Sequence, residues 1–592
     1  MHQHYHFYDE KPLKADPQLL RRMLRYARPY RGILVLALGL TMLVTALQLA
    51  QPYILKIAID QYILGPGDAA GLRLLVFSFF IAFSMGLLLH YWQFNLLMRT
   101  GQRIVNDIRL DAFAHLQELP VSFLDRNPAG RLVTRVTNDA EIISEMYTGF
   151  LLDLCRDLFL LAGIVVVMLR LHAPLALLTF TFMPLVVLAM IIYRRQARPV
   201  FRELRRQLAR LNAFAAENIA GIRVIQAFLQ QERRLGLFSA INEAHYRAAL
   251  REMKIFAVFR PAMDLIRSLA LAALLWFGGA SVLAGVIPFG VLFAFINYLE
   301  QFFRPLNDLS ERYSIFQSAL AAAERIFQML DEKKEADTAV GEGATDEGAT
   351  KIILGDIHFN GVWFAYTEDE WVLRDINLQI KAGEKVAIAG PTGAGKTSLV
   401  HLLNRFYPFA RGEIILDGID IREFGLKELR RQVGIVQQDI FLFNASIREN
   451  ITLNAITLSE GELEVVCRAA GLYPFIQEMP QKFETPVGER GFSLSTGQRQ
   501  LLALARILVF NPSIFILDEA TAHLDAETEE VLQHSLAHAM QGRTSIIIAH
   551  RLSTLRLADR IFFLQQGILT PVQNINHLLE KLGIPSSGDP LI

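Results

Sequence analysis

The sequence predicts two fused parts, an α-helical membrane domain with six spans and, after it, an α/β domain. Three observations lead to this fold class. Of the 592 residues, 52% are hydrophobic, and the surplus of apolar residues lies almost entirely before residue 310. A charged segment with few bulky apolar residues comes next. The rest of the chain has an ordinary globular composition and contains a strand that leads through a glycine-rich turn into a helix.

Six stretches are long and apolar enough to cross a bilayer as helices, since one span takes roughly 20 residues. They lie near 32–54, 71–97, 147–169, 173–193, 262–285 and 288–310. The third and fourth are separated only by Arg170, Leu171 and His172, so we expect a tight turn there.

Arg residues at alternate ends of these spans set their orientation, because cytoplasmic loops are enriched in Lys and Arg. The loops DQYILGPGDAAG and GGASVLAGVI contain neither residue. The basic positions precede the first span or follow the second and fourth: Arg21, Arg22, Arg25, Arg28, Arg31, Arg99, Arg103, Arg109, Arg194, Arg195, Arg198 and Arg202. We therefore expect both termini to be cytoplasmic, with PQLLRRMLRYARPY as an interfacial amphipathic helix ahead of the first span.

Two long polar segments, about 98–146 and about 194–261, separate spans on the cytoplasmic side. Both carry helix-forming residues at helical spacing, as in FRELRRQLARLNAFAAENIAG. We expect spans two to five to continue as helices well beyond the membrane. The turns at their tips, near LPVSFLDRNPAG and near AENIAGIRVIQAF, would then be free to touch another domain. Surface loops without a partner are the alternative.

Ionisable residues within the apolar stretches are costly and therefore noteworthy. Asp153, Arg156 and Asp157 are spaced for contact on the third span, and Asp264 and Arg267 on the fifth. The favoured interpretation is ion pairs that satisfy each other near the interface. Pairs that line an aqueous cavity are the alternative.

The segment 331–350 reads DEKKEADTAVGEGATDEGAT and cannot bury enough apolar surface to fold alone. We expect it to link a membrane domain at 17–330 to a second domain at 351–592. The tail 1–16 is polar and lacks the apolar core of a secretory signal.

Charge and cysteine content argue against several classes of protein. Lys plus Arg and Asp plus Glu both number 59, so no nucleic acid is expected as a partner. Cys155 lies in an apolar stretch and Cys467 in the globular half. We therefore expect neither a disulfide framework nor a metal cluster.

The glycine-rich turn GPTGAGKT matches the phosphate-loop pattern G-x-x-x-x-G-K-[ST]. Its glycines let backbone N–H groups wrap phosphates, because no Cβ atom is in the way, and the following helix N-terminus favours anions. Lys396 would reach the β- and γ-phosphates, and the Thr397 hydroxyl is a hard oxygen ligand for Mg²⁺. The predicted phosphate-binding residues are Gly390, Pro391, Thr392, Gly393, Ala394, Gly395, Lys396, Thr397 and Ser398.

A second buried strand, in SIFILDEAT, ends in two acidic residues. Asp518 would hold Mg²⁺, and Glu519 would polarise the water that attacks the phosphate. A strand that ends in a solvated pair of acids is the alternative, which the phosphate loop makes improbable.

From about residue 20 to about residue 570 the chain resembles the ABC exporters of the multidrug type, and its motifs follow the order found in that family. VWFAYTED resembles the segment whose aromatic residue, here Tyr366, stacks on adenine. GIVQQDIFLF resembles the loop whose glutamine, Gln438, reaches Mg²⁺ and faces the membrane domain. ATAHLD and IIIAHRLST resemble the segments with an aspartate that signals across the dimer, Asp525, and a switch histidine at the γ-phosphate, His550.

Further segments carry the same resemblance. TPVGERG resembles the stretch that touches the cytoplasmic tips, and GRLVTRVTND and ENIAGIRVIQAF resemble the two intracellular loops. LSTGQRQLLALARIL resembles the family signature and its helix. The signature residues, which would contact ATP bound to the other half, are Leu494, Ser495, Thr496, Gly497 and Gln498.

The resemblance implies a six-span transmembrane domain of the ABC exporter type fused to a P-loop NTPase domain. It implies ATP and Mg²⁺ as ligands, and Glu519 and His550 as catalytic residues. The expected function is ATP-driven export of a small amphipathic or drug-like compound through the bacterial inner membrane. Lipid flipping and an ATP-gated channel or regulator on the same fold are alternatives. The fusion argues against an importer, and the spans argue against a soluble ATPase.

The chain departs from the family pattern at two places. Thr496 stands where the signature has Gly, and a β-branched residue is less suited to close approach or to unusual φ. After Gly567 the chain reads ILTPVQNINHLL rather than E-x-G-x-H. Because one ATP site would contain the altered signature, we expect a heterodimer with a second half-transporter; a homodimer is the alternative.

Overall fold

The computed structural model describes residues 17–65, 69–335, 353–367, 370–488, 491, 494–518, 526–549 and 552–582. It divides into two compact units. The helical unit comprises Met1–Gln117 and Ala129–Glu332, and the α/β unit comprises Glu118–Pro128 and Lys333–Ile592. A short segment from the first half of the chain therefore packs as part of the α/β unit.

Nearly all of the described helical unit is α-helix, interrupted by π-helical turns. Its elements, with the short α4 of the α/β unit, are α1 (Pro17–Ala27), η1 (Arg28–Tyr30), α2 (Arg31–Ile57), η2 (Ala58–Ile63), α3 (Ala69–Gln117), α4 (Val121–Arg126), α5 (Ala129–Thr134), η3 (Arg135–Asp139), α6 (Ala140–Glu145), η4 (Met146–Phe150), α7 (Leu151–Phe180), α8 (Met183–Ala220), α9 (Ile222–Ala227), α10 (Gln231–Leu283) and α11 (Phe289–Asp331).

Helices occupy all six predicted spans, which confirms the helical membrane domain. By length and composition alone, four described helical stretches are long and apolar enough to cross a membrane: Pro17–Ile63, Ala69–Gln117, Ala129–Phe180 and Gln231–Leu283. The fourth predicted span is helical in the last part of α7 and the first part of α8, and the sixth is helical within α11. The expected turn between spans three and four is a kink at His172, whose backbone is non-helical.

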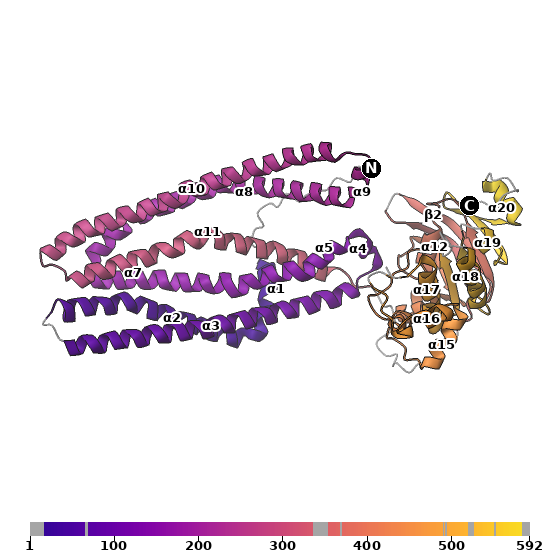
Figure 1. The fold of residues 1–592 in the computed structure, drawn as a ribbon, viewed down its shortest axis with the longest axis horizontal. Coiled ribbons are helices and arrows are strands. Elements are labelled where there is room, and N and C mark those ends of the chain that lie inside the picture. Colours follow the sequence, from indigo (N-terminus) through magenta and orange to yellow (C-terminus); the bar gives the residue numbers. More distant parts are fainter. Residues whose placement is uncertain are drawn as a thin grey trace. The chain divides into compact units, whose positions relative to one another are not determined.

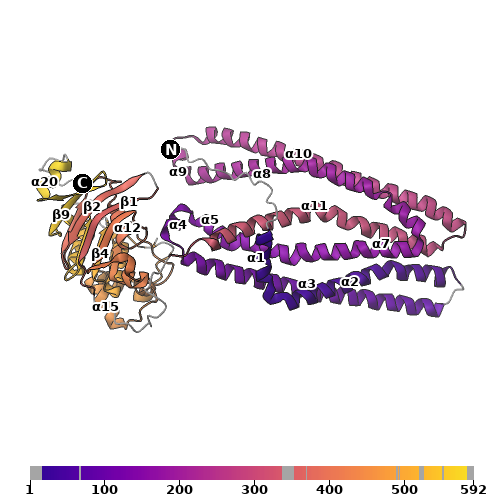
Figure 2. The same cartoon turned by 180° about the vertical axis from the view of Figure 1, so that it is seen from behind.

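The extended helices expected beyond the spans are present. In Figures 1 and 2, α8 and α10 lie side by side along most of their length, and α9 forms the turn between them. The core of the spanning region gathers around Phe295 and Tyr298 of α11, which are fully buried. The Tyr298 hydroxyl donates a 2.7 Å hydrogen bond to the Leu49 carbonyl of α2 and so satisfies its one polar atom.

The amphipathic segment ahead of the first span forms α1, but its buried side chains pack on protein. Met23 and Ala27 join a core with residues of α3, α6 and α11, and Tyr147 donates a hydrogen bond to the Met23 carbonyl. Leu24 on the same helix is about half exposed. The helix is therefore anchored to the bundle through one face and free on another.

The ionisable residues within the spans pair with each other, as both interpretations expect. Arg156 lies 3.2 Å from Asp153 and 3.3 Å from Asp157, and Arg267 lies 3.5 Å from Asp264. A further partly buried pair joins η3 to α11. The Asp139 carboxylate accepts two hydrogen bonds from Arg325 of α11, at 2.6 and 2.9 Å.

The α/β unit combines two sheets with flanking helices. Its further elements are β1 (Ile357–Ala365), β2 (Trp371–Ile380), β3 (Lys385–Ala389), α12 (Lys396–Leu403), β4 (Arg411–Leu416), β5 (Ile419–Asp420), η5 (Ile421–Glu423), α13 (Leu426–Gln432), β6 (Val433–Val436), α14 (Ile447–Thr452), α15 (Glu460–Ala469), α16 (Tyr473–Glu478), η6 (Lys482–Glu484), α17 (Thr496–Phe510), β7 (Ile514–Asp518), α18 (Ala526–Ala539), β8 (Thr544–Ile548), α19 (Leu552–Leu555), β9 (Arg560–Gln565), β10 (Ile568–Val572) and α20 (Ile575–Leu582).

One sheet is antiparallel, in the order β2-β1-β4-β5, and the other runs β10-β9-β3-β8-β7-β6. Strands β9, β3, β8, β7 and β6 pair in parallel, and only β10 is antiparallel to its neighbour. β7 and β8 are buried along their whole length, as strands covered on both faces should be. In both views α15 lies on the side of this unit away from β2 (Figures 1 and 2).

The atypical C-terminal segment ILTPVQNINHLL is folded. Ile568–Val572 forms β10, which pairs with β9, and α20 follows. β10 is the edge strand of its sheet, and this position tolerates Pro571, which has no N–H to donate to a further strand.

Replacing Arg325 with Leu should destabilise the protein, because Asp139 has a side chain about 10% exposed and would lose its two-point partner. We expect a loss of about 1–3 kcal/mol, seen as a lower midpoint of thermal unfolding in detergent. The control is Arg206→Leu, which removes an exposed pair with Glu203 and should cost less than about 1 kcal/mol. Equal midpoints for the two variants would contradict the expectation.

Candidate nucleotide-binding site

The parallel sheet brings the predicted phosphate-binding residues to one edge. In sheet order β3, β8, β7 and β6 are neighbours, so their carboxyl ends meet at the same side. The loop 390–395 follows β3, Asp518 ends β7, and Gln438 comes two residues after β6. Segments spread over more than 120 residues of sequence are thus gathered by the strand order alone.

The loop that follows β3 needs glycine for two different reasons. A Cβ atom on Gly390 would lie 2.1 Å from the Leu564 carbonyl oxygen of β9, which no side chain tolerates. Gly393 has φ +82° with open space around its Cβ position, so conformation rather than crowding favours glycine there. The loop can therefore run close against the sheet and still turn outward.

Lys396 begins α12 and is buried, with about 5% of its surface exposed. Its ammonium group donates hydrogen bonds to the carbonyl oxygens of Gly390 at 2.7 Å and Pro391 at 3.0 Å. The side chain thus folds back over the loop, and its positive charge lies next to the loop backbone.

The N-terminus of α12 adds further donors. Its N-cap is Gly395, which has no side chain to satisfy the first backbone N–H groups. Such unsatisfied N–H groups, together with the helix dipole, favour a bound anion. The loop, the helix end and Lys396 combine backbone donors with one positive charge, as a polyphosphate requires.

Oxygen ligands suited to Mg²⁺ lie in the same region. Thr397 is exposed in the first turn of α12, and Asp518 is about 6% exposed at the end of β7. Gln438 is exposed in the loop after β6. A carboxylate, a hydroxyl and an amide oxygen are the hard donors that Mg²⁺ prefers, so the residues present fit this ion.

Tyr366 follows the end of β1 and lies beside α12. Its hydroxyl and that of Ser398 are 2.9 Å apart, and its ring contacts Phe364 and Tyr407 edge-on, with centroids 4.7 and 5.0 Å away. About half of the Tyr366 surface remains exposed, which leaves ring surface for a base. Tyr366 and Ser398, both predicted as ATP-binding, are therefore brought together.

The signature residues form the start of α17. Ser495 is the N-cap, and its side chain accepts a hydrogen bond from the Gln498 N–H while the Gln498 side chain accepts one from the Ser495 N–H. Leu494 and Gly497 are buried, whereas Thr496 is exposed. Because Thr496 is the first helical residue, it needs no unusual φ, and the conformational argument against Thr there does not apply. The argument from side-chain bulk remains.

Three predicted residues, Glu519, Asp525 and His550, lie outside the described residues. The strands that precede Glu519 and His550 in the sequence are β7 and β8, adjacent in the parallel sheet. Their predicted roles therefore stay predictions.

Sequence reasoning missed one residue that packs against Tyr366. Tyr407 contacts its ring, and the Tyr407 hydroxyl donates a hydrogen bond to Asp125 of α4. Asp125 lies in LPVSFLDRNPAG, a predicted tip that was expected to touch another domain, but Tyr407 belongs to no recognisable motif, and only the fold brings the two together. The same holds for His401 of α12, which stacks on Tyr407.

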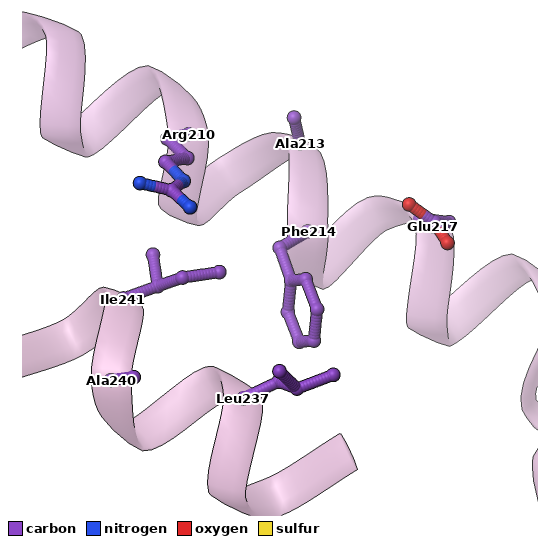
Figure 3. Close-up of a pocket in the computed structure, with 7 residues that line it drawn as sticks. All are labelled: Arg210, Ala213, Phe214, Glu217, Leu237, Ala240 and Ile241. Atoms are coloured by element: carbon purple, nitrogen blue, oxygen red, sulfur yellow. The ribbon is translucent and has the colours of Figure 1, made fainter.

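A surface cleft elsewhere is separate from this site. It lies in the helical unit between α8 and α10, where Phe214, Leu237 and Ile241 face one another and Arg210 lies at its rim (Figure 3). None of the predicted nucleotide-binding residues lines it.

Comparison with known proteins matches both halves of the chain. Residues 34–306 match the family model described as ABC transporter transmembrane region, and residues 373–522 match the model described as ABC transporter. The chain is 38% identical over 550 residues to the "Putative ABC transporter ATP-binding protein exp8" of Streptococcus pneumoniae serotype 4, with 93% of each chain covered.

Two further relatives are similar over most of their length. The "Probable multidrug resistance ABC transporter ATP-binding/permease protein YheH" of Bacillus subtilis is 38% identical over 513 residues, which cover 86% of this chain and 74% of that protein. An "ATP-dependent lipid A-core flippase" of Desulfotalea psychrophila is 32% identical over 569 residues, which cover 96% and 98%.

Gly390→Ala should abolish or strongly weaken ATP binding, because its Cβ would clash with the Leu564 carbonyl. The matched control is Gly393→Ala, whose Cβ meets nothing within 4 Å and whose cost is conformational, about 1–2 kcal/mol. Both variants would be titrated with a fluorescent ATP analogue after their thermal midpoints are checked. Equal affinities in the two folded variants would contradict the expectation.

Proposed function

Because this chain belongs to the family of ABC transporters in which membrane region and ATP-binding domain are fused, we propose that it is one half of a heterodimeric exporter of small amphipathic or drug-like compounds. The chain is an integral membrane protein that couples ATP hydrolysis to transport, and exporters of this type work as dimers. The observation that supports a heterodimer is Thr496 in an otherwise complete set of nucleotide motifs.

ATP is proposed to bind with its phosphates in the loop 390–395 and at the N-terminus of α12. Lys396 would exchange its two carbonyl partners for phosphate oxygens, since a buried ammonium group needs acceptors in either state. Tyr366 would stack on the adenine. Thr397, Gln438 and Asp518 would hold Mg²⁺, which supplies positive charge to offset the charge that develops on the phosphates.

Hydrolysis is assigned to Glu519 and His550. Glu519 would orient and polarise the attacking water, and His550 would contact the γ-phosphate. The second half would contribute its own signature segment to this ATP site, and Ser495 and the first N–H groups of α17 would contribute to the site on the partner. Asp525 would connect the two sites. Bound ATP would then favour a closed state in which the two nucleotide-binding domains hold ATP between them. Hydrolysis of the ATP would allow the two domains to separate.

Thr496 argues for two unequal sites. In a homodimer both ATP sites would contain this altered signature and would be affected together. In a heterodimer the altered signature affects only the site on the partner, and this chain's own Lys396, Asp518, Glu519 and His550 would face an intact one. The partner is therefore expected to carry the Gly-containing signature and a weakened catalytic carboxylate. A homodimer is the alternative.

The names of the relatives support two substrate classes. One relative is named for multidrug resistance, which supports a drug-like compound as the transported molecule. Another is named a lipid A-core flippase and matches 96% of this chain, which supports a lipid as the alternative. An ATP-gated channel or regulator would use the same motifs without directional transport.

The proposed location is the inner membrane of a bacterium, in agreement with the bacterial origin of the relatives. Both termini are proposed to be cytoplasmic, because the arginine-rich ends of the spans favour that side. The proposed domains are 17–330 and 351–592, joined by the linker 331–350 after the tail 1–16.

Purification of the untagged complex from its source tests the proposal directly. We expect a second, related polypeptide, and ATPase activity that amphipathic compounds stimulate. After reconstitution in vesicles the complex should accumulate a fluorescent dye with ATP, while accumulation of a short-chain fluorescent phospholipid would favour the flippase. A single-chain complex with two equivalent hydrolysing sites would rule out the heterodimer.

Glu519→Gln should keep ATP binding and remove most turnover, because the amide preserves shape but cannot polarise water as a carboxylate does. Nucleotide binding and phosphate release would be measured in the assembled transporter. Glu529→Gln, a change of the same kind in α18, serves as control and should leave turnover unchanged. Near-normal phosphate release by Glu519→Gln would refute the assignment.

Thr496→Gly should raise turnover of the assembled heterodimer by less than about twofold, since the site that it restores would still lack a catalytic carboxylate on the partner. The measurement is the steady-state ATPase rate with and without transported compound. A large increase, on the order of tenfold, would show that Thr496 itself limits hydrolysis.

A further inference from the structure

Tyr407 lies in the connection between α12 and β4 and forms a compact aromatic cluster with Phe364 and Tyr366. The three rings contact one another in edge-to-face geometry. Centroid distances are 4.7 Å for Phe364–Tyr366, 5.0 Å for Tyr366–Tyr407 and 5.8 Å for Phe364–Tyr407. Such geometry is attractive because the positive edge of one ring meets the negative face of another. The Tyr366 ring is therefore held from the side and has little freedom to rotate.

Tyr407 is itself supported by α12. The imidazole of His401 stacks on its ring at 6.0 Å with an interplanar angle of 22°. The His401 Nδ1 atom is buried and has no hydrogen-bond partner within the described part of the chain. Burial lowers the pKa of His401, against the opposing charges of Asp518 and Asp125, so the ring packs as a neutral group. The cluster thus rests on the helix that follows the phosphate loop.

The other end of Tyr407 reaches α4. Its hydroxyl donates a hydrogen bond to the Asp125 carboxylate, and burial, together with this contact, raises the pKa of Tyr407. α4 lies in the connection between α3 and α5, two helices of the helical unit, yet it packs as part of the α/β unit. Tyr407 therefore joins α4 to the Tyr366 cluster.

A second attachment fixes the start of the same segment. The Glu335 N–H donates a 2.8 Å hydrogen bond to the Glu118 carbonyl, and Lys334 pairs with the Glu118 carboxylate. The Glu335 carboxylate accepts two hydrogen bonds from Arg430 of α13, at 2.5 and 2.8 Å. α4 is thus held at its beginning by the chain that enters the α/β unit and near its end by Tyr407.

We propose that Tyr407 is a positioning residue that orients Tyr366 for the nucleotide base and, through Asp125, links base binding to the packing of α4 in the α/β unit. The proposal rests on the proposed role of Tyr366 in stacking on adenine. Such a link acts in both directions. A bound base that orders Tyr366 and Tyr407 favours the Asp125 contact, and α4 packed with this contact made favours base binding. Movement of α4 would then be passed along the chain to α3 and α5.

The test compares the affinity of the full transporter for ATP with that for inorganic tripolyphosphate, which has the phosphates but no base. Competition with a fluorescent ATP analogue gives both affinities. Tyr407→Phe keeps the ring and removes the bond to Asp125, whereas Tyr407→Ala removes both. The control is Tyr473→Phe, the same change on α16, where the ring packs against Arg468 instead.

We expect Tyr407→Ala to lower the ratio of ATP to tripolyphosphate affinity by roughly 2- to 12-fold, the range of one aromatic contact. Tyr407→Phe and Asp125→Ala should each lower it by about 2- to 5-fold, and the double variant should be no worse than either, because both remove one shared contact. Tyr473→Phe should leave the ratio unchanged. A purely structural role would instead lower both affinities together.

Two outcomes distinguish this proposal from its premise. If Tyr366→Ala lowers the ratio but the folded Tyr407 and Asp125 variants do not, Tyr366 binds the base and the positioning role of Tyr407 is refuted. If Tyr366→Ala leaves the ratio unchanged, the assignment of Tyr366 to the base fails and the positioning role fails with it. Additive effects of Tyr407→Phe and Asp125→Ala would refute the link through the shared hydrogen bond.

Discussion

The candidate nucleotide site depends on how closely the backbone at Gly390 approaches the Leu564 carbonyl of β9. This contact leaves no room for a side chain and holds the loop against the central sheet. The loop can then turn back so that its carbonyl oxygens meet the Lys396 ammonium group, and α12 can start at the point where a phosphate would lie. From α12, Ser398 reaches Tyr366, and His401 supports Tyr407.

A second constraint comes from the membrane and shapes the helical unit differently. A bilayer offers no hydrogen-bond partners, so backbone groups must be satisfied within helices and buried side chains within the protein. Thr41 shows this twice, because its hydroxyl donates to the Ala37 carbonyl and accepts from the Gln93 amide of α3. Many apolar side chains of the spans remain exposed in the isolated chain, as expected for surfaces that lipid covers.

The two constraints meet in the segment Glu118–Pro128. Its sequence lies between two long helices of the helical unit, but its contacts, through Asp125 and Glu118, belong to the α/β unit. A transporter that converts ATP binding into helix movement needs an element that is connected to the long helices along the chain and also contacts the ATP-binding domain. The polar, exposed character of α4 fits this position, since its anchoring uses a hydrogen bond and ion pairs rather than a large apolar face.

The sequence alone determined the features that depend on local chemistry. Apolar runs of span length must be helical in a bilayer, and a strand followed by GPTGAGKT predicts the loop and the helix start at Lys396. These predictions needed no knowledge of distant contacts, which is why the fold class and the phosphate loop could be derived from residue patterns.

Tertiary structure decided what depends on strand order and packing. The alignment of β3, β8, β7 and β6 brings Gln438, Asp518 and the loop to one edge, and no local pattern encodes that order. Thr496 has a helical backbone, so this position does not require the unusual φ that would have been unfavourable for a β-branched residue. Tyr407 and Asp125 are 282 residues apart; the sequence marked the segment of Asp125 as a tip that could touch another domain, but it did not identify Tyr407 as its partner. Their contact exists only because the folded chain returns α4 to the α/β unit, a long-range pairing that single-sequence periodicity does not record.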